Sequence, residues 1–258
     1  MNTSLLIDLD GVLYRGDDII SGSVNTIKWV QQQSIPHVFI TNTTSRPRRQ
    51  IVEKLNRLGF EIPAQSILTP PVAACQWLSN RVSGLTALFV PDNTREDFSS
   101  IPLLSEEDEA VSAVVLGDIA NAWTFEELNR AFRFLMREPK PVLIALGMTR
   151  YWQTADGLQL DVGPYVKALE YAAGCEAVVL GKPSAHFFKA ALKILQCVPA
   201  DALMIGDDIV GDIRGAQRAG IKGVLVRTGK FRASDLDSEI HPDAVIDSIS
   251  DLPEWLNQ

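Results

Sequence analysis

The chain has 258 residues, of which 46% are apolar and 22% are charged, and its formal charge is −8 with an isoelectric point near 5.0. This length and composition predict a globular protein with one large domain or two unequal ones. The acidic charge argues against nucleic acid as a partner, because binding to a phosphate backbone depends on clustered Lys and Arg. A small anionic substrate remains compatible with it where positive charge is local.

Cysteine usage and the absence of long apolar stretches predict the compartment. The cysteines are odd in number and far apart in the sequence: Cys75, Cys175 and Cys197. Because they lack the spacing of a metal site, they are typical of reduced thiols in a cytosolic protein. No window approaches the apolar length that crosses a bilayer, and no amino-terminal segment has a targeting pattern. We therefore expect a cytoplasmic protein with no membrane partner.

Short apolar runs alternate with segments of helical length along the chain. The predicted strands of one sheet are Ser4 to Ile7, Val38 to Thr41, Val178 to Leu180, Leu203 to Ile205 and Gly223 to Val226. This alternation is typical of an α/β fold, a doubly wound parallel sheet with helices on both faces. Ser45 before Arg46-Pro47 predicts the start of a helix that ends near Leu58-Gly59, and Thr69 before two prolines predicts another helix start.

A second pattern of elements occupies the middle of the chain. Its predicted strands lie near Ala87 to Val90, Ala113 to Leu116 and Val142 to Ala145, and its predicted helices near Phe125 to Met136 and Tyr165 to Ala173. The segment is too long to be a loop, because structureless connections beyond about 15 residues are uncommon in compact domains. We therefore predict a catalytic core formed by residues 1–71 and 178–258, with an inserted α/β domain at residues 72–177.

Two carboxylates mark the end of the first predicted strand. Asp8 and Asp10 directly follow the apolar run Leu5-Leu6-Ile7. Ligands of parallel sheets collect at the carboxyl ends of the strands, so both acids should lie at the mouth of the sheet. Two ionised carboxylates that are close together and partly buried need a cation or a shared proton. The pair therefore indicates a metal site, a reaction, or both.

Polar residues also follow the other predicted strands of the core. Ile40 leads into Thr41-Asn42-Thr43, Leu180 into Gly181-Lys182, and Ile205 into Gly206-Asp207-Asp208, with Asp212 shortly after. If these strands are neighbours, one site gathers carboxylates, a hydroxyl and one ammonium. Phosphoryl transfer requires such a set, because the transferred group carries charge on its equatorial oxygens. Mg²⁺ prefers oxygen ligands of this kind. Asp8 is placed to act as nucleophile and Asp10 as general acid and base.

These four segments together resemble the four motifs of the haloacid dehalogenase superfamily of phosphatases, and they occur in the same order. The long insertion resembles the C2-type cap of the NagD-like members. The resemblance implies Mg²⁺ held by Asp8, Asp10 and Asp207, with Asp10 contributing its backbone carbonyl. It implies phosphoryl-stabilising roles for Thr41 and Lys182 and supporting roles for Asp208 and Asp212. Substrate contacts are expected from the residues Thr41, Asn42, Thr43, Lys182 and Arg150.

Segments of the insertion narrow this resemblance to phosphatases that act on inorganic pyrophosphate and on the P–N bonds of phospholysine and phosphohistidine. These segments are Arg150-Tyr151-Trp152, Asp156-Gly157-Leu158, residues 160–165 and residues 168–172. Small phosphomonoesters are the alternative substrates, and a phosphoprotein is a possible partner. The resemblance also leaves open a homodimer. An alternative outside the enzymes is a receiver-like phospho-accepting signalling module. This chain differs from such modules in two features: an acid/base, Asp10, two residues after the predicted nucleophile, and an insertion of this length.

Two positive segments leave more than one interpretation open. Arg46, Arg48 and Arg49 lie near the start of a predicted helix, where they are either solvent-exposed or attract an anionic substrate. The Arg150 to Trp152 segment is compatible with the substrate face of the inserted domain and equally with packing. The sequence decides neither case.

Overall fold

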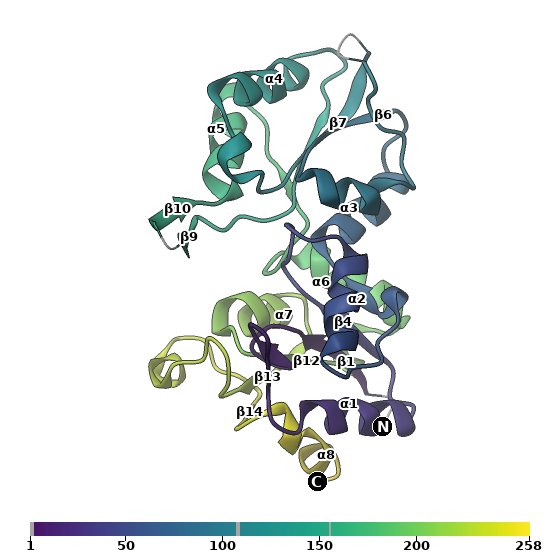
Figure 1. The fold of residues 1–258 in the computed structure, drawn as a ribbon, viewed down its shortest axis with the longest axis vertical. Coiled ribbons are helices and arrows are strands. Elements are labelled where there is room, and N and C mark those ends of the chain that lie inside the picture. The colour runs from purple at the N-terminus through teal and green to yellow at the C-terminus, as the bar shows by residue number, and fades with distance from the viewer. Residues whose placement is uncertain (1–2, 107–108, 155) are drawn as a thin grey trace. The chain divides into compact units, whose positions relative to one another are not determined.

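The computed structural model describes residues 3–106, 109–154 and 156–258, and the chain divides into two compact units (Figure 1). The first unit comprises residues 1–41, 49–68 and 182–258, and the second comprises residues 42–48 and 69–181. The division assigns residues 42–48, 69–71 and 178–181 to the second unit, whereas the sequence-based boundaries place them in the core. No helix in the described part of the chain combines the length and the apolar character needed to cross a membrane.

The first unit is built on a six-stranded parallel sheet. The strands are β1 (Ser4–Asp8), β4 (His37–Ile40), β5 (Ile67–Leu68), β12 (Ala202–Gly206), β13 (Lys222–Val226) and β14 (Ala244–Ile246), in the order β14-β13-β12-β1-β4-β5. A short antiparallel hairpin, β2 (Tyr14–Arg15) with β3 (Asp18–Ile19), follows β1. β1 is central and buried along its whole length, which explains the apolar run Leu5-Leu6-Ile7 in its interior.

Helices accompany this sheet at almost every crossover. They are α1 (Ser23–Gln32), α2 (Arg48–Arg57), α6 (Ala185–Leu195), α7 (Gly215–Arg218) and α8 (Leu252–Leu256), with a π-helical segment at Ile209–Arg214. Single 3-10 turns in this unit lie at Ala64–Ser66, Pro199–Asp201, Ala233–Asp237 and Ile249–Asp251. The predicted doubly wound parallel α/β fold is confirmed by this arrangement and by the structural relatives described below.

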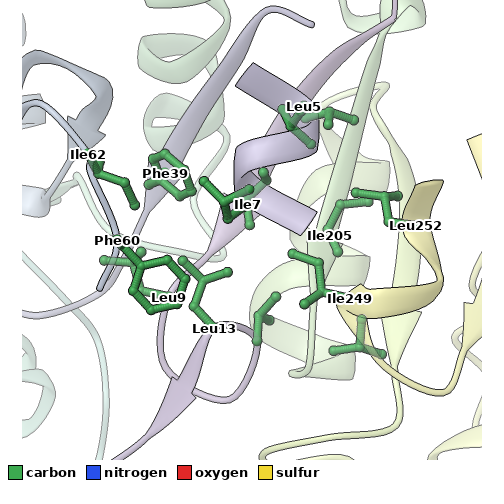
Figure 2. Packing of buried hydrophobic residues seen from close by; sticks show 14 of the residues in the cluster. Leu5, Ile7, Leu9, Leu13, Phe39, Phe60, Ile62, Ile205, Ile249 and Leu252 are labelled. Carbon is green, nitrogen blue, oxygen red and sulfur yellow. The ribbon is translucent and has the colours of Figure 1, made fainter. Parts of the chain in front are cut away.

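One apolar cluster fixes the sheet of the first unit in place. Alternate strand residues such as Leu5, Ile7 and Ile205 point to one face and pack with Ile249 and Leu252 (Figure 2). Such an alternation follows from the two-residue period of a strand. All five side chains are buried, so the central strands, and the loops at their carboxyl ends, rest on a close-packed base.

The second unit has its own parallel sheet and its own apolar core. Strands β6 (Leu85–Phe89), β7 (Val111–Leu116), β8 (Val142–Ala145) and β11 (Val178–Val179) are arranged as β11-β8-β7-β6. The helices are α3 (Pro70–Ser79), α4 (Phe125–Leu135) and α5 (Val162–Ala173), with 3-10 turns at Asp92–Phe98 and Ala120–Ala122. A hairpin, β9 (Tyr151–Thr154) with β10 (Gly157–Leu160), was not predicted because its strands are largely exposed.

Two sequence-based assignments are wrong. Val178 to Leu180 was predicted as a strand of the first sheet, but β11 pairs with β8 in the second. Ser45 was predicted to cap α2, but the helix begins at Arg48, whose backbone N–H donates to both carboxylate oxygens of Asp97 at 3.2 and 3.0 Å. By contrast, the cap predicted at Thr69 is present, since its hydroxyl accepts from the Val72 N–H.

Candidate active site

Neighbouring strands bring the acidic residues together. Strand β1 ends at Asp8, and β12, its parallel neighbour, ends at Gly206 directly before Asp207. On the other side of β1, strand β4 ends directly before Thr41, which is buried. Carboxylate oxygens of Asp8, Asp207 and Asp212 lie within 4.8 Å of one another, and all three residues are buried. The acids at the ends of these two strands therefore do share one site, as the sequence analysis predicts for parallel neighbours.

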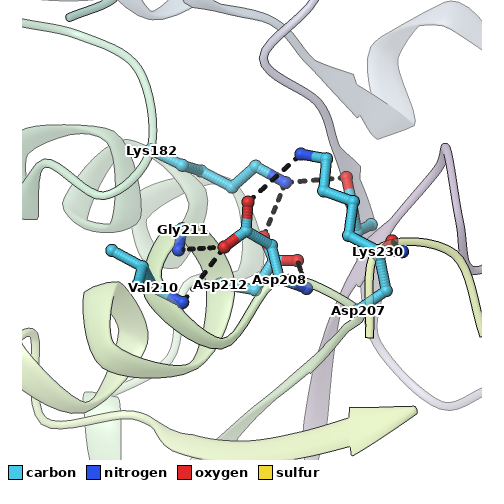
Figure 3. Close-up of polar contacts among 8 residues, drawn as sticks. Lys182, Asp207, Asp208, Val210, Gly211, Asp212 and Lys230 are labelled. Carbon is cyan, nitrogen blue, oxygen red and sulfur yellow. Dashed lines mark hydrogen bonds and ion pairs between the residues drawn. The ribbon is translucent and has the colours of Figure 1, made fainter. Parts of the chain in front are cut away.

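Lys182 is the ammonium at the centre of this acidic group. Its Nζ lies 2.7 Å from Asp8 Oδ1. On the other side it lies 2.7 Å from Asp212 Oδ1 (Figure 3). The exposed fraction of the Lys182 side chain is only 6%, so these contacts form away from bulk water. Lys182 does not follow a strand of the first sheet, since β11 belongs to the other sheet. It reaches the site nonetheless, because it precedes helix α6 of the first unit.

Burial and charge act in opposite directions on these groups. Burial raises the pKa of the Asp8 carboxyl, although the Lys182 ammonium works against the shift. Burial likewise raises the pKa of Asp212 to about 6, again opposed by Lys182. For Lys182 itself burial disfavours the charged form, but the carboxylates of Asp212 and Asp8 outweigh it and raise its pKa. The lysine therefore stays protonated and provides the positive charge that offsets two buried acids.

The two carboxylate oxygens of Asp207 differ in their hydrogen bonding. Its Oδ2 accepts a hydrogen bond of 2.6 Å from the Lys230 backbone N–H. Its Oδ1 is buried and has no hydrogen-bond partner among the described residues. Burial raises the pKa of Asp207 to about 6, while the bond from the Lys230 N–H opposes the shift. A buried polar atom without a partner is costly, so Oδ1 is suited to binding a cation or another ligand.

The residues around this oxygen fit a divalent cation. The donors are hard carboxylate oxygens, which Mg²⁺ and Mn²⁺ both prefer. Gly11 leaves room for the Asp207 carboxylate, because a Cβ atom at position 11 would lie 1.9 Å from Asp207 Oδ2. Its positive φ of 90° is also one that residues with a Cβ adopt rarely. Asp8 and Asp207 could therefore hold a metal at this edge of the sheet.

Asp10 and Asp208 are placed differently from the central acids. The Asp10 side chain is exposed and does not belong to the buried acidic group, while the turn after it is closed by a 2.7 Å bond from the Gly11 N–H to the Tyr14 carbonyl. Asp208 caps the π-helical segment, since its Oδ1 accepts from the Val210 and Gly211 N–H groups. Its Oδ2 lies 3.1 Å from Lys230 Nζ. Asp208 thus fixes the segment that carries Asp212.

The remaining predicted substrate contacts lie in the second unit. Asn42 and Thr43 line a cavity of about 910 Å³ in that unit, together with Trp152 and Asp161. Arg150 is exposed, and its guanidinium lies 5.6 Å from the centre of the Tyr151 ring. The Lys230 N–H is a site group that the sequence motifs do not include. The signal for it was that residues 227–230 directly follow a core strand, as Thr41 and Asp207 do.

Comparisons with known proteins agree with this geometry. A family model described as haloacid dehalogenase-like hydrolase matches residues 5–100, and a second, described as HAD-hydrolase-like, matches residues 179–252. Human phospholysine phosphohistidine inorganic pyrophosphate phosphatase is 42% identical over 260 residues, which cover 98% of this chain and 94% of that protein.

Solved structures show the same fold. The p-nitrophenyl phosphatase from Archaeoglobus fulgidus has a TM-score of 0.88 and 27% identity, with 98% of each chain covered. NagD from E. coli K-12 has a TM-score of 0.84 with 96% of this chain and 97% of that chain covered, although identity is only 20%. The family models, the near full-length identity and the phosphatase relatives lead to one conclusion: the chain belongs to the haloacid dehalogenase-like hydrolases and is a phosphatase of that family.

Proposed function

We propose that this phosphatase is a Mg²⁺-dependent phosphohydrolase that works through an aspartyl-phosphate on Asp8. The observation that supports it most is the pairing of Asp8 with Lys182 inside a buried acidic group that leaves Asp207 Oδ1 open. A carboxylate at a strand end, beside an ammonium that favours its ionised form, is suited to nucleophilic attack on phosphorus. Asp8, Asp207 and the backbone carbonyl of Asp10 would hold the cation, which when bound neutralises charge on the phosphoryl oxygens.

The proposed reaction has two steps that use this chain's own groups. In the first, an Asp8 oxygen forms a bond to phosphorus while the bond between phosphorus and the leaving group breaks. Asp10 gives its proton to the leaving group. In the second, Asp10 takes a proton from a water molecule, which attacks phosphorus and releases phosphate from Asp8. Lys182 and the Thr41 hydroxyl stabilise the charge that develops on the transferred oxygens.

We further propose inorganic pyrophosphate and the P–N bonds of phospholysine and phosphohistidine as substrates, free or within a phosphoprotein. The support is the 42% identity to a human phosphatase named for these three compounds. The second unit, predicted as a substrate-enclosing insertion at residues 72–177, is proposed to select the leaving group and to exclude water. Small phosphomonoesters are the second candidate, favoured by the similarity to an archaeal p-nitrophenyl phosphatase.

Phosphate release from purified protein tests the proposal. We expect Mg²⁺-dependent release, faster from pyrophosphate and phospholysine than from sugar, nucleotide or aryl phosphates. Asp8→Asn should abolish it, whereas Asp17→Asn, at a side chain that is 97% exposed, should not. Borohydride reduces an acyl phosphate to an alcohol, so treatment during turnover should convert Asp8 to homoserine in the wild-type protein. Wild-type turnover in Asp8→Asn would overturn the mechanism, and preference for one monoester would overturn the substrate class.

A further inference from the structure

A loop after strand β13 contacts two segments of the proposed metal site, the turn after Asp10 and the carboxylate of Asp207. The Thr228 hydroxyl donates a hydrogen bond to the Gly11 carbonyl, and the Lys230 backbone N–H donates to Asp207 Oδ2 at 2.6 Å. The loop is itself closed by a bond from the Phe231 N–H to the Thr228 carbonyl. It therefore connects the turn after Asp10 to the carboxylate of Asp207, two segments that are far apart in the sequence.

Gly229 makes this close approach possible. A Cβ atom on Gly229 would lie 1.9 Å from Asp207 Oδ2 and 2.5 Å from the Gly11 Cα, and both glycines have positive φ. The Asp207 carboxylate thus occupies a slot between two glycine backbones. Any larger residue at position 229 would have to push the carboxylate or the Gly11 turn aside, since these contacts are shorter than packed atoms allow.

We propose that residues 228–230 form a positioning clamp for the metal site, an inference that rests on the proposed function. The Lys230 N–H binds Asp207 Oδ2 and so directs the open Oδ1 toward the acidic group. The Thr228 hydroxyl fixes the Gly11 carbonyl and with it the turn that carries Asp10. The clamp uses one main-chain group and one hydroxyl, which bind Asp207 and the Gly11 carbonyl. Partners of metal ligands commonly change metal affinity by 10- to 100-fold when removed.

Metal affinity of the full-length protein tests the clamp independently of turnover. Mn²⁺, which suits the same oxygen ligands, can be titrated into the metal-depleted protein and followed by electron paramagnetic resonance. We expect Thr228→Val and Gly229→Ala each to weaken Mn²⁺ binding by about 10- to 100-fold. Thr228→Ser, which restores the donor, should bind nearly as tightly as wild type. Arg227→Gln is the matched control beside this loop, because the Arg227 guanidinium pairs with the exposed carboxylate of Asp247 rather than with the site.

Asp207→Asn separates the two ways in which the inference could fail. If Asp207→Asn binds Mn²⁺ as tightly as wild type, the proposed metal site is wrong. If Asp207→Asn loses binding while Thr228→Val and Gly229→Ala retain it, only the clamp is wrong. Should Gly229→Ala fail to fold, the isosteric Thr228→Val and its rescue by serine decide the question. If Thr228→Val and Thr228→Ser bind Mn²⁺ with equal affinity, the proposed clamp is wrong.

Discussion

Lys182 Nζ lies 2.7 Å from Asp8 Oδ1, although the two residues are 174 positions apart in the sequence. Both side chains are almost fully buried, and Asp212 makes the same contact with the lysine from the other side. Two acids and one ammonium are therefore desolvated together. Such a group is stable only while every charge keeps its partner.

Replacing Lys182 by methionine should destabilise the protein strongly. The substitution leaves Asp8 and Asp212 buried without a counter-ion, and removal of one partner from a buried pair costs about 3–5 kcal/mol. We expect a loss of that size in the free energy of unfolding in urea at pH 8. The matched control is Lys230→Met, which removes an ion pair with Asp208 at a lysine side chain that is 72% exposed and should cost no more than about 1 kcal/mol.

The same loss should depend on pH in a defined direction. A carboxyl whose folded-state pKa exceeds its unfolded value favours folding most when protonated, and this contribution is lost as pH rises through the folded value. Asp212 already has a pKa near 6 with the lysine present. The destabilisation by Lys182→Met should therefore shrink between pH 8 and pH 5. An equal loss at both values would show that charge is not its cause.

The position of the acidic residues could be predicted because it follows from strand ends. Asp8 and Asp207 each come directly after a buried apolar run, and β1 and β12 are parallel neighbours. The sequence therefore identified these acids correctly as close together. The same reasoning misplaced the predicted strand Val178 to Leu180, because a three-residue apolar run carries no information about which sheet it joins.

Contacts between distant segments were beyond sequence reasoning. Ser45 has the residue type and position of an N-cap, yet Asp97 accepts the Arg48 N–H instead. The Lys230 N–H on Asp207 is a main-chain group, which no residue type reveals. Both contacts depend on how loops fold in three dimensions rather than on local propensity.

Asp97→Ala should destabilise the protein by about 1–2 kcal/mol, the usual cost of removing a helix cap. The reason is that the Arg48 N–H loses the two carboxylate oxygens that accept its hydrogen bonds. Ser45→Ala, at the exposed position first predicted as the cap, should change stability by no more than about 0.5 kcal/mol. Thermal and urea unfolding of both variants compare the two positions directly. A larger effect at Ser45 would restore the original assignment.

Asp207→Asn should stabilise the protein in the absence of metal. The folded-state pKa of Asp207 is about 6, above its ordinary 3.8, so ionisation of this carboxyl disfavours the folded state as pH rises. The shift corresponds to about 3 kcal/mol above pH 6, and asparagine avoids this cost. With a chelator present, the variant should exceed wild type in unfolding free energy at pH 8 but not at pH 4.

Adding Mg²⁺ should reverse that order. Ligands that bind only the folded state stabilise it, so the wild-type melting temperature should rise with Mg²⁺ while that of Asp207→Asn stays constant. Scanning calorimetry at pH 8 with and without Mg²⁺ measures both effects. A variant that gains as much from Mg²⁺ as wild type would remove Asp207 from the metal site.

Asp10→Asn should separate chemistry from stability. Because the Asp10 side chain is exposed and outside the buried acidic group, its loss of charge should change unfolding free energy by no more than about 0.5 kcal/mol. If Asp10 is the general acid and base, kcat should fall by about 10²- to 10⁴-fold. The rate of the first step, phosphorylation of Asp8, should fall least with p-nitrophenyl phosphate, because its leaving group departs without a proton. We then expect a burst of p-nitrophenol followed by slow turnover. Such a burst would show that Asp8 is phosphorylated faster than the aspartyl-phosphate is hydrolysed without a general base. Equal slowing of both steps would assign Asp10 a role other than proton transfer.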